Sequence, residues 1–341
     1  MMKRIKHIVI ASLCVAVFSL SQETDNSKRG TTAASFLSIG QGARAVGMGS
    51  AFVAVADDRS SLYWNPAGIA DLYNNGVLVD RTQWIADVDY TFIAASFSMQ
   101  DYGAIGFHLS TSKMGEMDVT TVEYPDGTGE MFDALDVAFG VTYAVKLTDA
   151  FTIGVTPKVV YQRIWRMSAT AMAVDIGIKY ATPFKGITLG MSVTNFGQKM
   201  QLAGNNGVVL YDPAPKEKGN NDRIPANLLM EEWPLPLNFR VGLAYDLLST
   251  EDHTVVLAVD ALHPNDNNES VNAGAEYTFQ KFLSVRGGYK TLFLDTSEES
   301  FALGFGIQKE LLNNVSLRVD YAYQNFQRLN YVQKFQIEIV F

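Results

Sequence analysis

The end of the chain alternates strictly between apolar and polar residues. Within Tyr331 to Phe341, the apolar positions are Phe335, Ile337, Ile339 and Phe341, and the polar positions are Lys334, Gln336 and Glu338. A period of two predicts a β-strand with one apolar and one wet face. A long apolar strand at the edge of a soluble sheet invites aggregation, whereas the last strand of a transmembrane barrel pairs with the first and leaves no edge. Taken alone, this stretch also fits the final strand of a soluble sandwich.

Similar segments follow one another from residue 76 onward. Turn residues divide this region into about fourteen segments, most of them about 10 residues long, which is the length of a tilted strand that crosses a bilayer. The segments are 76–83, 89–98, 102–112, 131–145, 150–163, 169–181, 186–195, 235–246, 253–262, 270–279, 283–291, 299–308, 314–324 and 331–341. Two are weaker, because 76–83 has a mixed pattern and Pro157 interrupts 150–163. Tyrosine and tryptophan near the segment ends, Tyr90 among them, suggest an aromatic girdle.

The connections between these segments alternate in length. Short ones lie near 100–101, 147–149, 183–185, 249–252, 280–281 and 311–313, and longer ones are 113–130, 196–234 and 263–269. Short turns at one end and long loops at the other are typical of an outer-membrane barrel. A soluble sandwich or lipocalin-like protein does not predict this asymmetry. We therefore expect an all-β fold, a transmembrane antiparallel β-barrel of about fourteen strands over residues 76–341, with its short turns in the periplasm.

The first residues predict export. Lys3, Arg4 and Lys6 precede an apolar run from Ile8 to Leu20 that is too short to span a bilayer, and small residues precede Gln22. We expect residues 1–21 to be a signal peptide that is removed, which places the protein in a bacterial outer membrane. The only cysteine, Cys14, would leave with it, so the mature chain would have no disulfide, thiolate nucleophile or cysteine metal ligand.

Composition excludes several classes of protein. Loss of residues 1–21 removes three of the 27 basic residues and none of the 36 acidic ones, which leaves 24 against 36 and a net charge of −12, so we expect no nucleic-acid partner. No later apolar run approaches the length of a transmembrane helix.

Enzyme motifs are missing from the sequence. There is no Gly-x-Ser-x-Gly, HExxH or P-loop, and the four histidines are scattered, so we expect no enzyme and no cofactor. His108 is interpreted as a hydrogen-bonded filler rather than a catalytic base. The loop acids Asp118, Asp126, Asp266, Glu298 and Glu299 are interpreted as solvated charges rather than a calcium site, so no metal is expected.

Residues 31–75 do not follow the strand pattern. Small residues dominate, and glycine recurs at 40, 42, 47 and 49. Asp57 and Asp58 can cap the segment that follows, from Arg59 to Trp64. Asn65-Pro66-Ala67-Gly68 predicts a rigid turn in which the Asn65 side chain bonds nearby backbone. Because the segment has too few large apolar residues for a core of its own, we expect residues 22–75 to be a hatch that plugs the barrel lumen.

Two stretches in this region carry a family resemblance. They are Gly-Ala-Arg-Ala-Val-Gly-Met-Gly-Ser-Ala-Phe-Val-Ala-Val-Ala-Asp-Asp (42–58) and Leu-Tyr-Trp-Asn-Pro-Ala-Gly-Ile-Ala (62–70). They resemble the N-terminal hatch of FadL-type outer-membrane proteins, and most of all the PorV/PorQ branch that is found with type IX secretion in Bacteroidetes-like bacteria. The match covers residues 33–71, and the remainder agrees in topology only. The resemblance implies a plugged barrel with a lateral opening between strands. It also implies that Asn65-Pro66-Ala67 corresponds to the NPA turn of the hatch, and Ala43-Arg44-Ala45 with Gly47-Met48-Gly49 to its glycine-rich entry. We therefore predict a hatch motif of Gly42, Ala43, Arg44, Gly47, Gly49, Asp57, Asp58, Asn65, Pro66, Ala67 and Gly68.

Two functions fit these observations. The resemblance favours a non-enzymatic accessory of protein export that docks to a translocon or to exported proteins. The alternative is a passive transporter of hydrophobic small molecules. The 196–234 loop offers apolar residues for a protein partner, with Leu228, Leu229, Met230 and Trp233 as candidates, although a disordered loop is the simpler interpretation. Besides outer-membrane lipid, the resemblance implies the barrel-insertion machinery as a partner, with Phe341 as its recognition signal.

Overall fold

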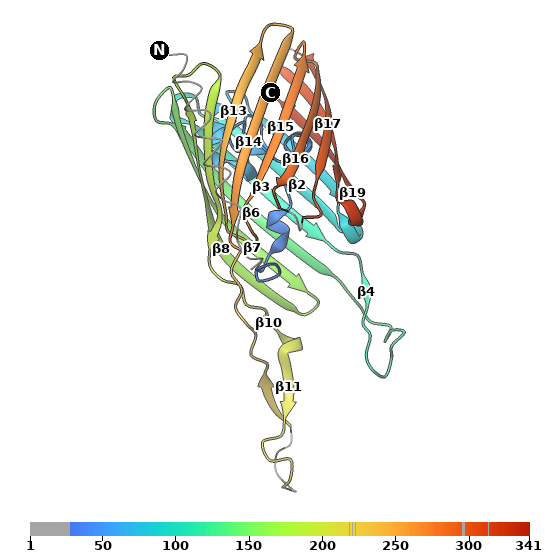
Figure 1. Cartoon of the computed structure of the whole chain (residues 1–341). Helices are drawn as coiled ribbons and strands as arrows, with labels where there is room; N and C mark the ends of the chain where they lie inside the picture. The colour runs from blue at the N-terminus through green and yellow to red at the C-terminus, as the bar shows by residue number, and fades with distance from the viewer. Residues whose placement is uncertain (1–27, 218, 220, 222, 295–296, 313) are drawn as a thin grey trace.

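The chain forms a closed antiparallel β-barrel of 14 strands (Figure 1). The computed structural model describes residues 28–341 except 218, 220, 222, 295–296 and 313, so the expected signal peptide, residues 1–21, lies outside the described residues. The barrel strands are β1 (Gly76–Gln83), β2 (Asp89–Ser98), β3 (Ala104–Lys113), β6 (Ala134–Lys146), β7 (Phe151–Ile164), β8 (Met167–Ala181), β9 (Ile187–Gly197), β13 (Asn238–Ser249), β14 (His253–Pro264), β15 (Ser270–Phe279), β16 (Leu283–Leu292), β17 (Phe301–Leu312), β18 (Val315–Asn325) and β19 (Tyr331–Val340).

Each of the fourteen predicted segments corresponds to one barrel strand, and the predicted fold class is confirmed. The ring closes because β1 pairs antiparallel with β19, from Gly76 opposite Val340 to Gln83 opposite Gln333. β19 ends one residue earlier than predicted. Phe341 lies beyond the strand, where its backbone N donates to Asn75 O at 2.9 Å.

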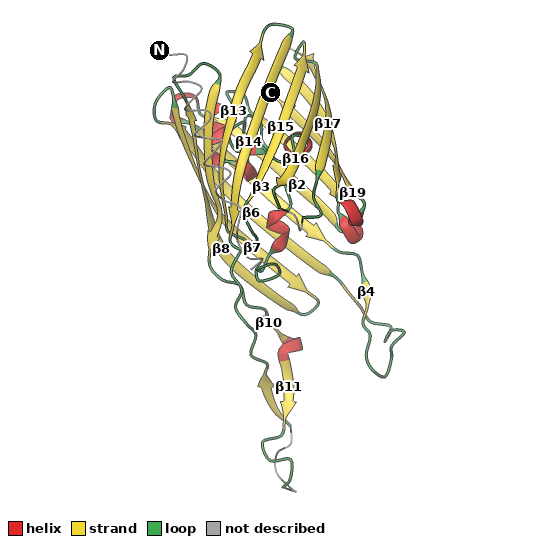
Figure 2. Cartoon of the chain, in the orientation of Figure 1, coloured by secondary structure: helices red, strands yellow, loops and turns green. Residues whose placement is uncertain are grey.

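Short elements fill the remaining described chain (Figure 2). They are η1 (Ser35–Ser38), α2 (Ala43–Gly47), α3 (Ser61–Trp64), η2 (Pro66–Asp71), η3 (Ile85–Asp87), η4 (Gln100–Tyr102), β4 (Met117–Asp118), β5 (Met131–Phe132), β10 (Ala203–Gly204), η5 (Asn205–Gly207), β11 (Val208–Tyr211), β12 (Ile224–Asn227) and η6 (Gln327–Leu329). None of the helices in the described part of the chain has the length and apolar character needed to cross a membrane.

Alternation separates an apolar outer face from a polar inner face. In β13, Phe239 is 41% exposed on the outside whereas Arg240 is 5% exposed on the inside. β1 alternates in the same way in spite of its mixed sequence, with Asp80 buried and Val79 exposed.

Tyr90 does not belong to an outer aromatic girdle, contrary to the prediction. It is 1% exposed, because it occupies one of the alternate positions of β2 whose side chains point into the barrel.

Pro157 does not interrupt its strand, which corrects the prediction. β7 runs through it, and Pro157 pairs with Val174 of β8. The ladder to β6 is what breaks. It pairs Gly140 with Lys158 and then Tyr143 with Val155, and leaves Pro157 without a partner on that side, since proline has no N–H to donate.

The two ends of the barrel differ. The short-turn end holds Asn75, Phe341 and the connections 99–103, 147–150, 182–186, 250–252, 280–282 and 313–314. The long-loop end holds 84–88, 114–133, 165–166, 198–237, 265–269, 293–300 and 326–330. The 114–133 and 198–237 loops project furthest from the barrel (Figure 1). The predicted asymmetry rests on the 114–133, 198–237 and 293–300 loops. The other connections at the long-loop end, 84–88, 165–166, 265–269 and 326–330, are no longer than 99–103 or 182–186 at the short-turn end.

Residues 34–72, here called the inner segment, lie within the ring of strands. Gly42 N donates to Asp80 of β1 at 2.6 Å, and Phe52 N donates to Asp260 of β14 at 2.7 Å. Leu62 lies against Gly106 of β3. Because these inward-facing partners come from separate parts of the closed ring, the segment that contacts all of them occupies its interior.

Candidate functional site

The inner segment begins at the long-loop end. Ala34 N donates to Gln162 Oε1 near the end of β7 at 2.9 Å, and Ala33 N donates to Pro234 O of the 198–237 loop at 2.9 Å. Just before it, Thr32 Oγ1 donates to Asp266 at 2.9 Å. The segment reaches the short-turn end before β1, where Arg59 Nη2 donates to Asn74 O at 2.7 Å. It therefore runs along the lumen from one end of the barrel to the other.

Glycines allow the inner segment to approach the wall closely. Gly49 has a φ of +63°, and a Cβ there would lie 2.6 Å from Tyr289 N, so a larger residue would be strained and would clash with β16. A Cβ at Gly47 would lie 2.9 Å from the Cα of Gly304 in β17. Gly47 and Gly49 of the predicted hatch motif thus meet Gly304 and Gly288 of the strands, backbone against backbone.

Arg44 of α2 is the centre of a buried charge network. Its guanidinium pairs with Asp57, with Asp58 at 3.2 Å and with Glu276 of β15 at 2.7 Å. Glu276 in turn pairs with Arg286 of β16. Buried charges need such partners, because an unpaired charge loses its hydration without compensation.

The network continues along the barrel wall. Arg286 Nη1 lies 2.7 Å from Asp320 Oδ1, and Arg318 Nε lies 2.9 Å from Asp320 Oδ2. A separate pair joins Arg59 to Glu338 of β19 at 2.7 Å, with both side chains 3% exposed. These contacts fasten the inner segment to strands close to the end of the chain.

Asp57 and Asp58 have separate roles. Both pair with Arg44, but Asp58 Oδ1 also accepts from Ser60 N at 2.9 Å and from Ser60 Oγ at 2.5 Å. The N-cap residue of α3 is Ser60, whose side chain makes no capping bond. Asp58 therefore orders the turn that leads into this helix.

Asn65 links the turn to the barrel. Its Oδ1 accepts from Ala67 N at 3.2 Å, and its Nδ2 donates to Val53 O at 2.7 Å and to Ile178 O of β8 at 2.9 Å. Pro66 begins η2, where a missing N–H costs nothing. Gly68 is confined by Ala56 O and Ser61 Cβ, so no side chain fits there.

Sequence reasoning missed the strand residues that receive the inner segment. Asp260 is 0% exposed and accepts from both Phe52 N and Val53 N, at 2.7 and 2.9 Å. Lys179 Nζ donates to Val55 O and Ala56 O at 3.1 Å. The sequence did contain a signal for them, because these charged residues occupy the inward-facing positions of strands whose outward-facing positions are apolar.

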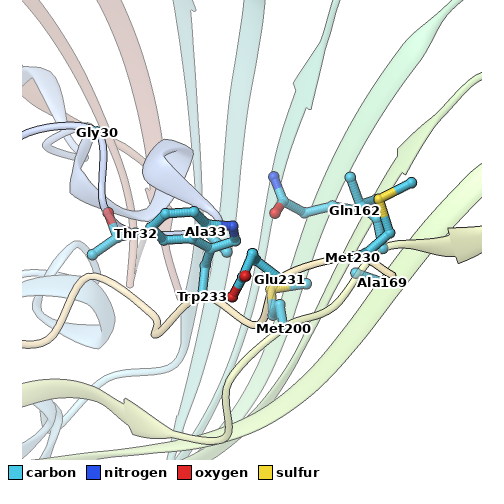
Figure 3. Close-up of a pocket in the computed structure, with 10 residues that line it drawn as sticks. Gly30, Thr32, Ala33, Gln162, Ala169, Met200, Met230, Glu231 and Trp233 are labelled. Atoms are coloured by element: carbon cyan, nitrogen blue, oxygen red, sulfur yellow. The ribbon is translucent and has the colours of Figure 1, made fainter. Parts of the chain in front are cut away.

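A cavity of about 260 Å³ lies at the long-loop end (Figure 3). One wall is Gly30, Thr32 and Ala33, and a second is Gln162 and Ala169 on the barrel rim. The base of the 198–237 loop forms the third wall, with Met200, Leu202, Met230, Glu231 and Trp233. The cavity is thus bounded by three parts of the chain that are distant in sequence.

Two of the four predicted partner residues belong to this cavity. Met230 and Trp233 line it, and Trp233 is 43% exposed. Leu228 and Leu229 lie outside it, at 51% and 91% exposure. The loop is not irregular throughout, because β11 and β12 form a two-stranded hairpin beyond its base. Each strand of that hairpin pairs only with the other.

No group of three or more His, Cys, Asp or Glu side chains in the described ranges could hold a metal ion. His108 is buried, but the predicted hydrogen bond is not made at its Nδ1, which has no partner. His253 and His263 contact Tyr277 and Glu269 at separate exposed places.

Comparisons with known proteins agree with this geometry. The family model described as "Type IX secretion system protein PorV" matches residues 22–263. No curated protein sequence matches the chain. Among solved structures, the CymD monoaromatic hydrocarbon channel superposes with a TM-score of 0.53 at 11% identity, over 89% of this chain and 97% of that one.

Two further structures are similar. The toluene transporter TbuX of Ralstonia pickettii has a TM-score of 0.51 at 12% identity, over 88% of this chain and 97% of that one. The toluene transporter TodX of Pseudomonas putida has a TM-score of 0.51 at 12% identity, with coverages of 88% and 96%. At such identities the likeness shows a shared barrel fold and nothing of the ligand.

Proposed function

Because the chain belongs to the family of the type IX secretion system protein PorV, we propose that it is a non-enzymatic accessory of protein export, which docks a translocon or exported polypeptides at its long-loop end. The chain is an outer-membrane β-barrel, and this proposal adds the partner and the surface. The exposed apolar side chains of the 198–237 loop carry it.

Those side chains are unusual for a loop in water. Val208, Val209, Leu210 and Tyr211 of β11 are all exposed, on both faces of the hairpin. An isolated two-stranded hairpin is marginally stable in water, and contiguous exposed apolar surface marks interaction sites. A protein partner that covers the hairpin would remove both liabilities.

We further propose that residues 22–75 act as a hatch that closes the lumen. The buried pairs of Arg44 and Arg59 with Glu276 and Glu338 support a resident plug, because displacing it would leave charges unpaired in the barrel. A plug held in this way favours docking at the surface over free passage through the pore.

A FadL-like transporter of hydrophobic small molecules is the second candidate. The apolar part of the cavity beside Trp233 favours it, together with a fold shared with channels that are named for toluene and monoaromatic hydrocarbons, whereas Glu231 in the same lining disfavours a neutral ligand. Uptake of radiolabelled toluene by cells with and without the protein distinguishes the two. Uptake that depends on the protein would support transport.

Assembly follows from the same class of protein. We propose that residues 1–21 are removed on export, that lipid surrounds the outer face, and that Phe341 is read by the barrel-insertion machinery. Phe341 suits this role because it lies beyond β19 with its side chain 49% exposed.

A pair of variants tests docking. The double variant Leu228→Ser/Leu229→Ser removes two exposed leucines of the loop, and Leu147→Ser removes a leucine that is 60% exposed at the short-turn end. We expect the double variant to lower the amount of type IX cargo at the cell surface, with Leu147→Ser unchanged. Barrel levels in the outer membrane are measured in parallel. Normal export by the double variant at normal barrel levels would exclude this surface.

A further inference from the structure

The cavity at the base of the 198–237 loop has walls of mixed chemistry. Met200, Leu202, Met230 and Trp233 supply flexible or aromatic apolar surface. Methionine adapts its shape to different apolar groups, and tryptophan offers a broad face. Figure 3 shows the side chains of Gln162 and Met230 on one side of the space and those of Ala33 and Trp233 on the other.

The polar residues of the cavity are not equivalent. Gln162 is occupied, because its Nε2 donates to Asp136 at 2.9 Å and its Oε1 accepts from Ala34 N. Thr32 is occupied by Asp266. Glu231 is exposed at the cavity, and among the described residues its carboxylate has no recorded ion pair or hydrogen bond. The same holds for the neighbouring Glu232 within the described chain. The site therefore offers apolar walls beside uncompensated negative charge.

Backbone bonds close the base of the loop at the cavity. There the two limbs meet in an antiparallel bridge, in which Met200 N donates to Trp233 O at 2.8 Å and Trp233 N donates to Met200 O at 2.9 Å. Gln201 adds one side-chain bond to Met230 O at 2.6 Å. Between this bridge and the hairpin, Leu228 and Leu229 are exposed.

We propose that this cavity binds one large apolar side chain of an extended polypeptide, with a neighbouring lysine or arginine of that polypeptide facing Glu231. The cavity lies just below the ~300–1,000 Å³ that is usual for drug-sized ligands, so it has room for one large side chain. Size alone also admits a small hydrocarbon, but the exposed carboxylate of Glu231 in the lining favours a ligand that carries a cation beside its apolar group. This assignment rests on the proposed docking function and names the chemistry that the site recognises.

The residues just before the inner segment take part in the site. Gly30, Thr32 and Ala33 form one wall, and Thr32 and Ala33 are held to the long-loop end by the bonds to Asp266 and Pro234. The site is therefore complete only when residues 30–33 are in place, which couples binding at the loop to the start of the proposed hatch.

Cysteine protection tests the assignment on the purified full chain in nanodiscs. Met230→Cys places a thiol in the cavity, and Val122→Cys, at a fully exposed position in the 114–133 loop, is the matched control, both in a Cys14→Ala background. The probes are acetyl-Ser-Phe-Lys-Ser-amide, its Phe→Ala and Lys→Glu versions, and toluene. We expect the first peptide to slow maleimide labelling at position 230 and not at 122. Burial of the aromatic side chain predicts that the Phe→Ala peptide protects roughly tenfold more weakly or worse.

The charge is tested separately. We expect the Lys→Glu peptide to protect position 230 only weakly, because its carboxylate would face that of Glu231. Glu231→Gln should weaken protection by the lysine peptide, and protection by the Lys→Glu peptide should stay the same or increase. Equal protection by toluene and by the lysine peptide would overturn the assignment in favour of a hydrocarbon site. Absence of protection by any peptide at millimolar concentration would overturn it as well.

These experiments distinguish a failure of the cavity assignment from a failure of the docking proposal. If the Leu228→Ser/Leu229→Ser variant blocks export while no peptide protects position 230, the docking function stands and the cavity assignment falls. If a peptide protects position 230 but the leucine variant exports normally, the cavity binds polypeptide and the export surface lies elsewhere.

Discussion

At the scale of single residues, charge inside the barrel is the main feature. Arg44, Arg286 and Glu276 are each almost completely buried, yet each has an opposite charge within contact distance. Outside, at the rim, Arg81 pairs with Asp89 while both side chains remain largely in water. Breaking an arginine–carboxylate pair therefore costs a different amount of free energy inside the barrel and at its exposed rim.

Replacing Arg44 by methionine should be strongly destabilising. It would leave Asp58 and Glu276 short of a buried partner, and breaking a buried pair costs about 3–5 kcal/mol. Arg81→Met is the control, since its pair is 73% and 59% exposed and such pairs contribute about 0–1 kcal/mol. Urea unfolding in lipid vesicles measures both losses. Similar losses for the two variants would contradict a special role of the lumenal network.

At the scale of elements, β19 has three roles in the fold. It closes the ring against β1, it carries Glu338 for the pair with Arg59, and it presents Phe341 at its end. The β11–β12 hairpin is the opposite case, because it is exposed on both faces and contributes little to the barrel.

Deleting Phe341 should impair insertion rather than stability. In the folded chain its recorded hydrogen bond is made by the backbone N to Asn75 O, and the ring is half exposed. We expect the deletion to leave protein in the periplasm, and Phe341→Tyr, which keeps an aromatic terminus, to insert normally. Fractionation of cells followed by immunoblotting measures both. An unchanged insertion yield for the deletion would argue against the signal.

At the scale of the whole molecule, the main feature is the path of the inner segment through the barrel. It enters beside the long loops, near Gln162 and Pro234, and leaves beside the short turns at Asn74. The beginning of the described chain is consequently at the opposite end of the barrel from the beginning of β1.

Surface labelling should report this path. Thr31→Cys, at the long-loop end, should react with a membrane-impermeant maleimide in intact cells. Asn74→Cys, at the short-turn end, should react only after the outer membrane is permeabilised. Both are made in a Cys14→Ala background. The reverse pattern would show that the long loops face the periplasm.

Removing residues 31–75 should open the barrel. The strands keep their own pairs, such as Arg286 with Asp320, so we expect the truncated protein to insert. Without the segment, the space lined by Gly190, Gly274 and Gly288 would be free. Single-channel conductance in planar bilayers compares the truncated and full-length proteins. If the two conduct equally, the segment is not a plug.

Much of the barrel was predictable from sequence because lipid and lumen impose different chemistry on alternate residues. Phe239 and Arg240 differ in exposure for that reason alone, and their parity follows from a period of two. Tyr90 and Pro157 show the limit of this reasoning. An aromatic near a strand end faces either side, and a proline can open one ladder while its strand continues.

The sequence by itself determined the strands, their number, the asymmetry of the connections and the separate character of residues 31–75, since all of these depend on local alternation and on glycine and proline. Only the tertiary structure decided the partners. Arg44 meets Glu276 across 232 residues, and Asp260 meets Phe52 across 208. Closure of the ring and threading of the inner segment bring these residues together, and no local pattern encodes a contact that depends on how distant strands are arranged around a common interior.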